Sequence, residues 1–305
     1  MGIRFDDQVV IVTGGGNGLG RSHCLAYAKL GAKVLVNDLG GNREGHGSSL
    51  SAAETVVEEI KASGGEAIAN GANVADRDQV NAMIQQAVDA WGRVDVLVNN
   101  AGILRDKSFA KMEMSDFDLV VDVHLLGAAN CTKAAWPFMV EQGYGRIVMT
   151  SSSSGLFGNF GQANYSSAKM ALVGLMNTLH LEGKKHDIRV NTLAPFAGTR
   201  MLDGLLPEEI GALADPSLVT PAVLFMSSKE APSRTIMGAG AGAFSAVHIY
   251  ETNGKFLGNR DVSADDVAAN WEEISSPEGE RLSQDAGQQG QNFLELMQAG
   301  LQQSQ

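Results

Sequence analysis

The sequence has few cysteines and no long apolar run. Its two cysteines, Cys24 and Cys131, lie in apolar, helix-like segments without the spacing of metal ligands, so we expect buried free thiols and neither a disulfide framework nor a bound metal. No stretch approaches the roughly 18 consecutive apolar residues of a membrane-spanning helix. The first apolar run, which follows Arg4 and two aspartates, is too short for a signal peptide. We therefore expect a soluble protein that is not exported.

Positive charge is also scarce. The chain has 23 Lys and Arg residues against 35 Asp and Glu residues, a formal net charge of -12. Such a chain is repelled by nucleic acid and by anionic membranes, so we expect a small-molecule substrate and neither of those partners. Residues 261–305 alone hold nine acidic residues and one basic residue, which marks the C-terminal tail as a compositional unit of its own.

Short apolar segments alternate with helix-like segments through most of the chain. The predicted strands are 9–12, 33–37, 67–74, 94–98, 146–150, 188–193 and 235–240. The main predicted helices between them are 76–91, 115–141 and 164–181. This alternation predicts an α/β fold, a doubly wound parallel sheet of the Rossmann type with helices on both faces and ligands at the carboxyl ends of the strands.

The pattern changes after Pro195. Residues 196–218 are interrupted by two prolines, which is typical of a flap over a site. Residues 243–257 contain Asn253-Gly254, a strong hairpin signal, and are followed by two short amphipathic helices predicted at 264–274 and 293–301. We therefore expect a dinucleotide-binding and catalytic domain at 1–242, with a substrate flap at about 196–218, and a C-terminal extension at 243–305 that consists of a hairpin and short helices.

A glycine-rich turn joins the first predicted strand to the first predicted helix. It reads Thr13-Gly14-Gly15-Gly16-Asn17-Gly18-Leu19-Gly20. Glycines there let a ligand approach the backbone, and a helix that begins near Gly18 directs its amide groups at a pyrophosphate. A glycine cluster can be a tight turn and nothing more, but the strand before it and the helix after it favour dinucleotide binding.

Asp38 ends the second predicted strand, 20 residues after Gly18. A carboxylate there can accept hydrogen bonds from the adenosine ribose hydroxyls and repels a 2′-phosphate, so it favours NAD over NADP. Arg21 and Arg43 are nearby cations that could weaken this preference. The alternative for Asp38 is an ordinary acid that begins a turn.

Tyr165 and Lys169 are four residues apart in a predicted helix and therefore share one of its faces. A cation held close to a phenol favours the phenolate, so the pair could transfer a proton at neutral pH. Ser152 follows the fifth predicted strand, where it could bond a substrate oxygen beside the phenol. Each of these residues also has an ordinary structural explanation, a helix surface or a solvated loop.

Together these motifs resemble those of the short-chain dehydrogenase/reductase family, in order and in spacing. The matching set is Thr13-Gly14-x-x-x-Gly18-x-Gly20, Asn99-Asn100-Ala101-Gly102, Ser152 and Tyr165-x-x-x-Lys169. Within the family, stretches at 37–41, 100–106, 158–165, 194–198 and 268–271 are similar to the (3R)-hydroxyacyl-CoA dehydrogenases. The resemblance covers nearly the whole chain and is weakest after Ser275.

The resemblance implies NAD-dependent oxidation of a secondary alcohol. In that reaction Tyr165 is the general acid and base, Lys169 lowers its pKa and binds the nicotinamide ribose, and Ser152 orients the substrate oxygen. The implied cofactor-binding residues are Thr13, Gly14, Asn17, Gly18, Leu19, Gly20, Asp38, Asn73, Val74, Asn100, Ala101, Gly102, Tyr165, Lys169, Pro195, Ala197 and Gly198.

Two positions depart from the common family pattern. His124 stands where many members have an asparagine that holds a proton-relay water, so it is either a fourth catalytic residue with that role or a core histidine. Asn73 stands where aspartate is more usual, and its amide can still bond adenine.

The predicted substrate is a (3R)-hydroxyacyl-CoA. A steroid or another bulky secondary alcohol is the alternative, and a non-catalytic NAD-binding protein is a third possibility. The candidate cations for the phosphates of CoA are Arg105, Lys107, Arg200 and Arg234. Because the sequence ends Gln-Ser-Gln and not Ser-Lys-Leu, we expect a cytoplasmic location, and we expect a homodimer or homotetramer.

Overall fold

The computed structural model of the protein describes residues 2–197 and 214–303. Its contacts divide the chain into two compact units, Met1–Ala246 and Val247–Gln305. The division between the two units falls four residues after the domain boundary predicted at residue 242. The predicted division into a catalytic domain and an extension stays a prediction. Each unit is described by itself.

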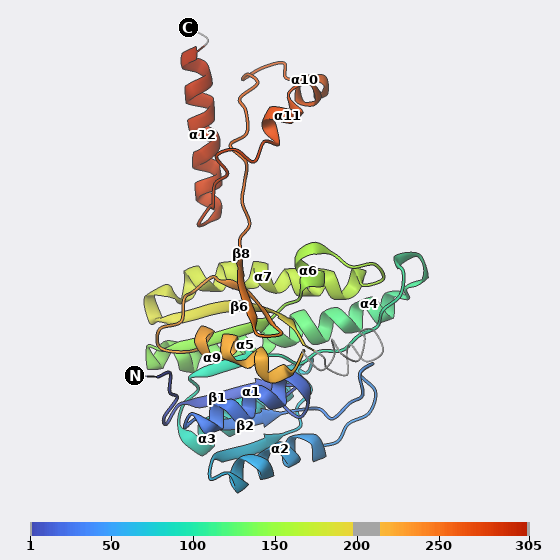
Figure 1. Ribbon diagram of the computed structural model, residues 1–305, viewed down its shortest axis with the longest axis vertical. Coiled ribbons are helices and arrows are strands. Elements are labelled where there is room, and N and C mark those ends of the chain that lie inside the picture. The colour runs from blue at the N-terminus through green and yellow to red at the C-terminus, as the bar shows by residue number, and fades with distance from the viewer. Residues whose placement is uncertain (1, 198–213, 304–305) are drawn as a thin grey trace. The chain divides into compact units, whose positions relative to one another are not determined.

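In the described part of the first unit, eight strands form one sheet in the order β3-β2-β1-β4-β5-β6-β7-β8 (Figure 1). Their bounds are β1 Val9–Thr13, β2 Lys33–Asn37, β3 Glu66–Asn70, β4 Val96–Asn99, β5 Gly145–Thr150, β6 Ile188–Phe196, β7 Ile236–Gly240 and β8 Ala243–Val247. Every neighbouring pair from β3 to β7 is parallel. The strand order reverses between β1 and β4, where a doubly wound sheet has its ligand-binding crevice.

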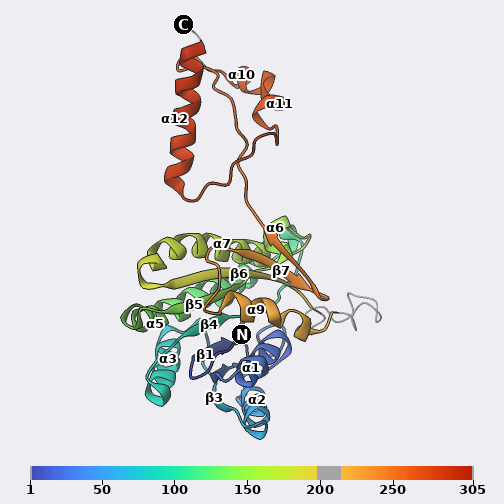
Figure 2. The same cartoon turned by 60° about the vertical axis from the view of Figure 1, so that its left-hand side comes forward.

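Helices cover both faces of this sheet (Figure 2). On one face α1 packs against α2 and α9, and on the other α5 packs between α3 and α7. Their bounds are α1 Gly18–Lys29, α2 Ser51–Ala62, α3 Arg77–Trp91, α4 Met114–Val121, α5 Gly127–Gln142, α6 Ser153–Phe157, α7 Ala163–Gly183 and α9 Thr220–Met226. A single π-helical turn, Asp122–Leu126, joins α4 to α5, so the predicted long helix at 115–141 contains a local bulge.

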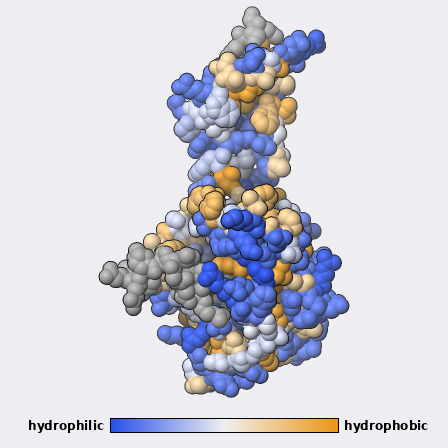
Figure 3. All heavy atoms as spheres, turned by 90° about the vertical axis from the view of Figure 1, so that its right-hand side faces the viewer, coloured by the Kyte–Doolittle hydropathy of each residue, from blue (hydrophilic) through white to orange (hydrophobic). Residues whose placement is uncertain are grey.

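The core lies between the sheet and these helices. β1 is buried along its whole length, which explains its continuous β-branched sequence, because a strand with helices on both faces has no polar side. Cys24 and Cys131 are both buried, as expected. Hydrophilic side chains cover most of the face of this unit seen in the space-filling view, with smaller apolar patches between them (Figure 3). In the described ranges, no helix combines the length and the apolar content needed to cross a membrane.

The end of the third strand was predicted wrongly. The strand ends at Asn70, and the expected last residues, Asn73 and Val74, lie in the loop that follows. Asn70 turns the chain because its side-chain oxygen accepts hydrogen bonds from Ala72 N at 2.8 Å and from Asn37 Nδ2 at 2.9 Å. A partly buried amide network ends the strand, although the apolar pattern continues to Val74.

The hairpin prediction was also wrong in its position. The turn lies at Ala241 and Gly242, between β7 and β8, and both residues have positive φ, 49° and 77°. A two-residue connection can join only antiparallel neighbours. Asn253-Gly254 lies outside any strand, because the Asn253 side chain is bonded to Glu278 O and to Arg281 Nε instead.

The second unit contains three helices in its described part, α10 Ala264–Ala269, α11 Trp271–Ile274 and α12 Ala286–Gln303. Arg281 organises it, because its backbone pairs with Glu251 and its guanidinium group bonds Asn253 Oδ1 and Asn292 Oδ1. α12 begins seven residues before the predicted start at Phe293. Several large apolar side chains of this unit are exposed, among them Trp271, Phe293 and Leu294.

Candidate active site

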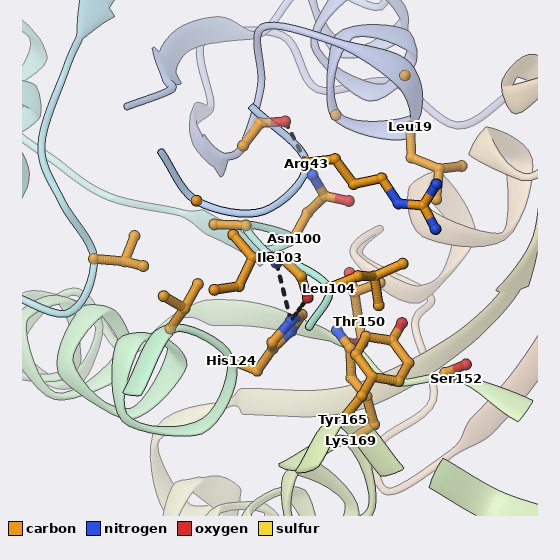
Figure 4. Close-up of a pocket in the computed structure, with 18 of the residues that line it drawn as sticks. Leu19, Arg43, Asn100, Ile103, Leu104, His124, Thr150, Ser152, Tyr165 and Lys169 are labelled. Carbon is orange, nitrogen blue, oxygen red and sulfur yellow. Dashed lines mark hydrogen bonds between the residues drawn. The ribbon is translucent and has the colours of Figure 1, made fainter. Parts of the chain in front are cut away.

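One cavity of about 520 Å³ lies at the carboxyl ends of the strands of the first unit (Figure 4). It brings together the two halves of the predicted site, the loops after β1 to β4 and the catalytic residues after β5. The predicted site residues that line it are Gly14, Asn17, Gly18, Leu19, Gly20, Asp38, Asn73, Val74, Asn100, Ala101, Gly102, His124, Ser152, Tyr165, Lys169, Pro195 and Ala197. Gly198 lies outside the described residues, as does most of the predicted flap at 196–218.

The glycine turn after β1 is packed too closely for other residues. A Cβ atom on Gly20 would lie 2.0 Å from Gly14 O, and one on Gly16 would lie 2.8 Å from Asp38 Oδ2. Asn17, which precedes α1, makes no side-chain capping bond, and the first turn of α1 holds no acid. The helix therefore presents its first amide groups and its positive dipole end at the cavity, which fits the pyrophosphate of a dinucleotide.

Asp38 is held against this turn from both sides. Its Oδ2 atom accepts a hydrogen bond from Gly16 N at 2.9 Å and its Oδ1 atom accepts one from Gly40 N at 2.7 Å. Each carboxylate oxygen keeps a second lone pair for a ligand. The carboxylate thus has a fixed orientation at the cavity wall and can accept further hydrogen bonds.

Asn100 and Thr13 hold the loops after β4 and β1 together. Asn100 Nδ2 donates to Thr13 O at 3.0 Å and to Gly14 O at 3.1 Å, while Thr13 Oγ1 accepts from the backbone nitrogens of Asn100 and Ala101. The Asn100 amide therefore positions the glycine turn. The sequence motif predicts a cofactor contact for Asn100 and carries no signal for this supporting role.

Another supporting residue that sequence reasoning missed is Asn130 in α5. Its Nδ2 atom donates to Val74 O at 3.1 Å and fixes the loop that carries Asn73 and Val74 along the cavity wall. The one sequence signal for this role is a polar asparagine inside an otherwise helical pattern. Its function depends on the packing of α5 near a loop 56 residues earlier in the chain.

Tyr165 and Lys169 lie on one face of α7, close to Ser152 (Figure 4). Lys169 Nζ donates to Thr150 O and lies 5.4 Å from the centroid of the Tyr165 ring. Ser152 is the N-cap residue of α6, and its Oγ atom accepts a hydrogen bond from Ser154 N at 3.2 Å. The three side chains therefore meet at one end of the cavity, as the i, i+4 spacing and the strand-end serine predicted.

Burial sets the proton affinities of this group. It raises the pKa of Tyr165 to about 12, although a hydrogen bond with Ser152 acts in the opposite direction. Burial also lowers the pKa of Lys169 to about 7. The pKa of Tyr165 is raised because burial disfavours the charged phenolate, and the role of Lys169 in lowering it stays a prediction.

His124 lies in the π-helical turn and is buried beside Tyr165, with the two rings edge to face at 5.1 Å. Its Nε2 atom lies 2.8 Å from Ile103 O and 3.1 Å from Ile103 N, so it donates in one tautomer and accepts in the other. Burial, followed by the charge of Lys169, holds the pKa of His124 well below its usual range. The side chain is therefore a neutral imidazole at physiological pH.

A second, much smaller cavity of about 10 Å³ lies behind the catalytic residues, lined in part by Lys169 and Leu172. Three of its lining residues have a buried polar atom without a partner in the described structure, namely Asn99 Oδ1, Thr150 Oγ1 and His124 Nδ1. A polar cavity of this size holds about one water molecule. Orphaned polar atoms around it indicate such a site.

Of the candidate CoA cations, the three that the structure describes do not line the cavity. Arg105 and Lys107 both pair with Asp116, at 2.8 Å and 3.6 Å. Arg234 precedes β7 and bonds Val190 O near the start of β6, at the edge of the sheet opposite the cavity. Arg200 lies outside the described residues. Across residues 2–197 and 214–303, no cluster of three or more histidine, cysteine or acidic side chains could hold a metal ion.

The sequence and the fold both match known dehydrogenases. The short chain dehydrogenase family model matches residues 8–208. Peroxisomal multifunctional enzyme A from Dictyostelium discoideum is 48% identical over 277 residues, 90% of this chain and 62% of that protein. A putative short-chain type dehydrogenase/reductase from Mycobacterium tuberculosis is 45% identical over 278 residues, 91% of this chain and 97% of that protein. Full-length peroxisomal multifunctional enzyme type 2 from Drosophila melanogaster superposes with a TM-score of 0.83 at 35% identity, over 97% of this chain and 50% of that one.

The fold and the site define an oxidoreductase that uses a nicotinamide cofactor. The chain belongs to the short-chain dehydrogenase/reductase family, which confirms the predicted resemblance and the predicted α/β fold. It spans 62% of the length of the Dictyostelium relative and half of the Drosophila protein.

Proposed function

We propose that the protein oxidises the 3-hydroxyl group of (3R)-hydroxyacyl-CoA thioesters with NAD as the hydride acceptor. The observation that carries the proposal is the meeting of Ser152, Tyr165 and Lys169 at one end of a cavity whose other end presents Asp38. Its similarity to multifunctional enzymes supports the substrate class. The carboxylate of Asp38 supports NAD over NADP, because it would repel a 2′-phosphate.

Different residues of the chain would bind different parts of the cofactor. The amides at the start of α1 would bind the pyrophosphate, Asp38 the adenosine ribose, and the loop with Asn73 and Val74 the adenine, while Lys169 would bond the nicotinamide ribose. NAD, when bound, supplies the hydride acceptor and a positive charge near the phenol. The glycine packing and the uncapped helix start both suit this ligand.

Tyr165 exchanges the proton of the reaction. As the alcohol is oxidised, its hydroxyl proton passes to the Tyr165 oxygen, and Ser152 holds the same substrate oxygen by a hydrogen bond. Because burial raises the pKa of Tyr165, the group is a phenol at neutral pH and must first lose its proton. Oxidation is therefore expected to become faster as the pH rises, since the phenolate fraction rises with it.

His124 would support the path by which this proton leaves. A water in the small cavity, next to Lys169, would form hydrogen bonds with the three atoms that otherwise have none, His124 Nδ1, Thr150 Oγ1 and Asn99 Oδ1. It would donate to the imidazole nitrogen and the amide oxygen, and the threonine hydroxyl could donate to it. A neutral imidazole suits this positioning role, because it can accept at Nδ1 while it donates to Ile103 O at Nε2. The alternative is that His124 only fills the core behind Gly102.

Exposed phenylalanines flank the catalytic end of the cavity and favour a substrate with an apolar portion. Phe109 belongs to the segment after β4, and Phe157 and Phe160 belong to the segment between β5 and α7, with exposed fractions of 70%, 75% and 91%. The two segments are joined by a hydrogen bond from Gln162 Nε2 to Asp106 Oδ2. An acyl chain and a steroid both have such a portion, so dehydrogenation of steroids or other bulky secondary alcohols is the second candidate.

A substrate panel tests the proposal. NADH formation is measured with (3R)- and (3S)-hydroxyacyl-CoA of several chain lengths and with β-hydroxysteroids, and each assay is repeated with NADP. We expect turnover of the (3R) thioesters with NAD, a rate that rises with pH, and a slower rate in a His124→Phe variant that retains ADP-ribose binding. Turnover of steroids without turnover of any hydroxyacyl-CoA would make the second candidate correct.

Oligomeric state and location stay predictions. Exposed apolar side chains on α12, including Phe293, Leu294 and Leu301, support a homodimer or homotetramer. Light scattering coupled to size-exclusion chromatography measures the mass directly. The names of the multifunctional relatives place them in peroxisomes, so cell fractionation decides between that compartment and the predicted cytoplasmic location.

A further inference from the structure

The loop between β2 and α2, residues 39–49, has a defined shape without regular secondary structure. Ser49 N donates to Leu39 O at 2.9 Å, which closes its base. Asn42 Oδ1 accepts hydrogen bonds from Glu44 N at 3.0 Å and from His46 N at 2.9 Å, which orders its tip. The backbone position of Arg43, between these two bonded ends, is therefore fixed.

This loop crosses the glycine turn. Leu104 N donates to Arg43 O at 3.1 Å, and Arg105 Nε donates to Glu44 O at 2.7 Å. The loop starts after β2 and its partner segment follows β4, and these two strands flank β1 in the sheet. The connection therefore passes over the carboxyl end of β1, where the glycine turn and the start of α1 lie.

Arg43 is half-buried and lines the main cavity, and its side chain points towards Leu19 in the first turn of α1 (Figure 4). Within the ranges that the structure describes, Arg43 and Lys169 are the two lysine or arginine side chains that line the cavity. Lys169 is bonded to Thr150 O at the catalytic end. Of these two cations, Arg43 is thus the one beside the first turn of α1.

We propose that Arg43 binds the pyrophosphate of the cofactor from the side opposite the amide groups of α1. The inference rests on the proposed binding of NAD. A pyrophosphate carries two negative charges, and a helix N-terminus supplies only about half of a positive one. A guanidinium group adds a full charge and a planar pair of donors that match phosphate oxygens. Arg43 therefore neutralises negative charge of the pyrophosphate that the glycine turn and the start of α1 alone do not neutralise.

This position differs from that of a residue that reads the 2′-phosphate of NADP. The ribose end of the cavity is marked by Asp38 at the end of β2, whereas the Arg43 backbone is bonded to Leu104, on the other side of β1. Arg43 should therefore act on NAD and NADP alike. In this position Arg43 would set the affinity for both cofactors and would not weaken the preference for NAD.

Calorimetry with ADP-ribose and adenosine tests the assignment without catalysis. Arg43→Gln should weaken ADP-ribose binding about 10- to 100-fold, because a charged hydrogen bond to phosphate is lost. Adenosine, which has no phosphate, should bind the variant as it binds the wild type. Arg43→Lys should recover part of the loss, and added salt should weaken the wild type more than Arg43→Gln.

The matched control is Arg21→Gln, because Arg21 lies on α1 beside the glycine turn but pairs with Glu59 of α2. This variant should bind ADP-ribose as the wild type does. Unchanged ADP-ribose binding in Arg43→Gln would refute the inference, as would an equal loss of adenosine binding or a loss confined to NADP. Absence of ADP-ribose binding in the wild type would instead refute the proposed NAD dependence itself.

Discussion

The main cavity has a cofactor end around Asp38 and Asn100 and a catalytic end around Tyr165 and Lys169. The two ends differ in how their polar groups are satisfied. At the cofactor end, polar groups satisfy one another: Asp38 accepts from Gly16 N and Gly40 N, and Asn100 ties two loops together. At the catalytic end, burial acts against charge, since it raises the pKa of Tyr165 to about 12 and lowers the pKa of Lys169 to about 7. The cofactor end should therefore stabilise the fold, while the catalytic end should cost stability.

This difference predicts whether a substitution changes binding, stability or activity. A change at the cofactor end should reduce binding and stability together, because the same atoms do both. A change at the catalytic end should separate activity from stability, because the buried groups that react are not the ones that hold the fold together. Three substitutions test this separation.

Tyr165→Phe should have the largest effect. Loss of the proton-transfer group should lower kcat by about 10²- to 10⁴-fold, while the remaining ring keeps its edge-to-face contact with His124. ADP-ribose binding and thermal stability should stay near wild-type values. Steady-state kinetics, calorimetry and thermal melts measure the three quantities. Turnover at the wild-type rate would remove Tyr165 from the proposed mechanism.

Gly20→Ala should reduce binding and stability together. Its Cβ atom would lie 2.0 Å from Gly14 O and 2.7 Å from Asn100 Nδ2, so the turn must shift. We expect ADP-ribose binding at least about 10-fold weaker and an unfolding free energy lower by about 1–3 kcal/mol.

Gly174→Ala is the control for this substitution, because Gly174 lies in α7 with no atom within 4 Å of a new Cβ. That change should stabilise by about 0.5–1 kcal/mol through helix propensity. If Gly20→Ala behaved like Gly174→Ala, the cofactor end would not be close-packed as described.

Lys169→Met should stabilise the protein without cofactor while it abolishes activity. Because the pKa of Lys169 is lowered from 10.5 to about 7, the folded protein binds fewer protons than the unfolded chain between these values. The free energy of unfolding of the wild type therefore rises with pH between about pH 7 and pH 10.5. The unfavourable free energy of burying the charged ammonium is fully present below pH 7.

The gain from Lys169→Met should accordingly be largest below pH 7, at roughly 1–2 kcal/mol after loss of the Thr150 hydrogen bond, and should shrink towards pH 10. Urea unfolding at several pH values measures it. A destabilised variant, or a difference that does not change with pH, would break the proposed contrast between the two ends.

The sequence by itself determined most of the fold and predicted many of the residues that line the main cavity. The second strand was predicted at 33–37, as found, because the middle of a strand that is buried on both faces is apolar, and the run from Val34 to Val36 is visible locally. The glycine turn and the Tyr165–Lys169 pair were also readable, since each depends on spacings of a few residues.

Only the tertiary structure decided what depends on distant segments. The amide network that ends β3 at Asn70, the tie between Asn100 and Thr13, and the proton affinities of Tyr165 and Lys169 all arise from burial or from contacts between loops far apart in the chain. Arg43 is the clearest case. Its neighbour Leu104 is 61 residues away, and no local pattern predicts that the two meet above the glycine turn. Desolvation and long-range hydrogen bonding are properties of the packed chain, so they become visible only when its segments are assembled.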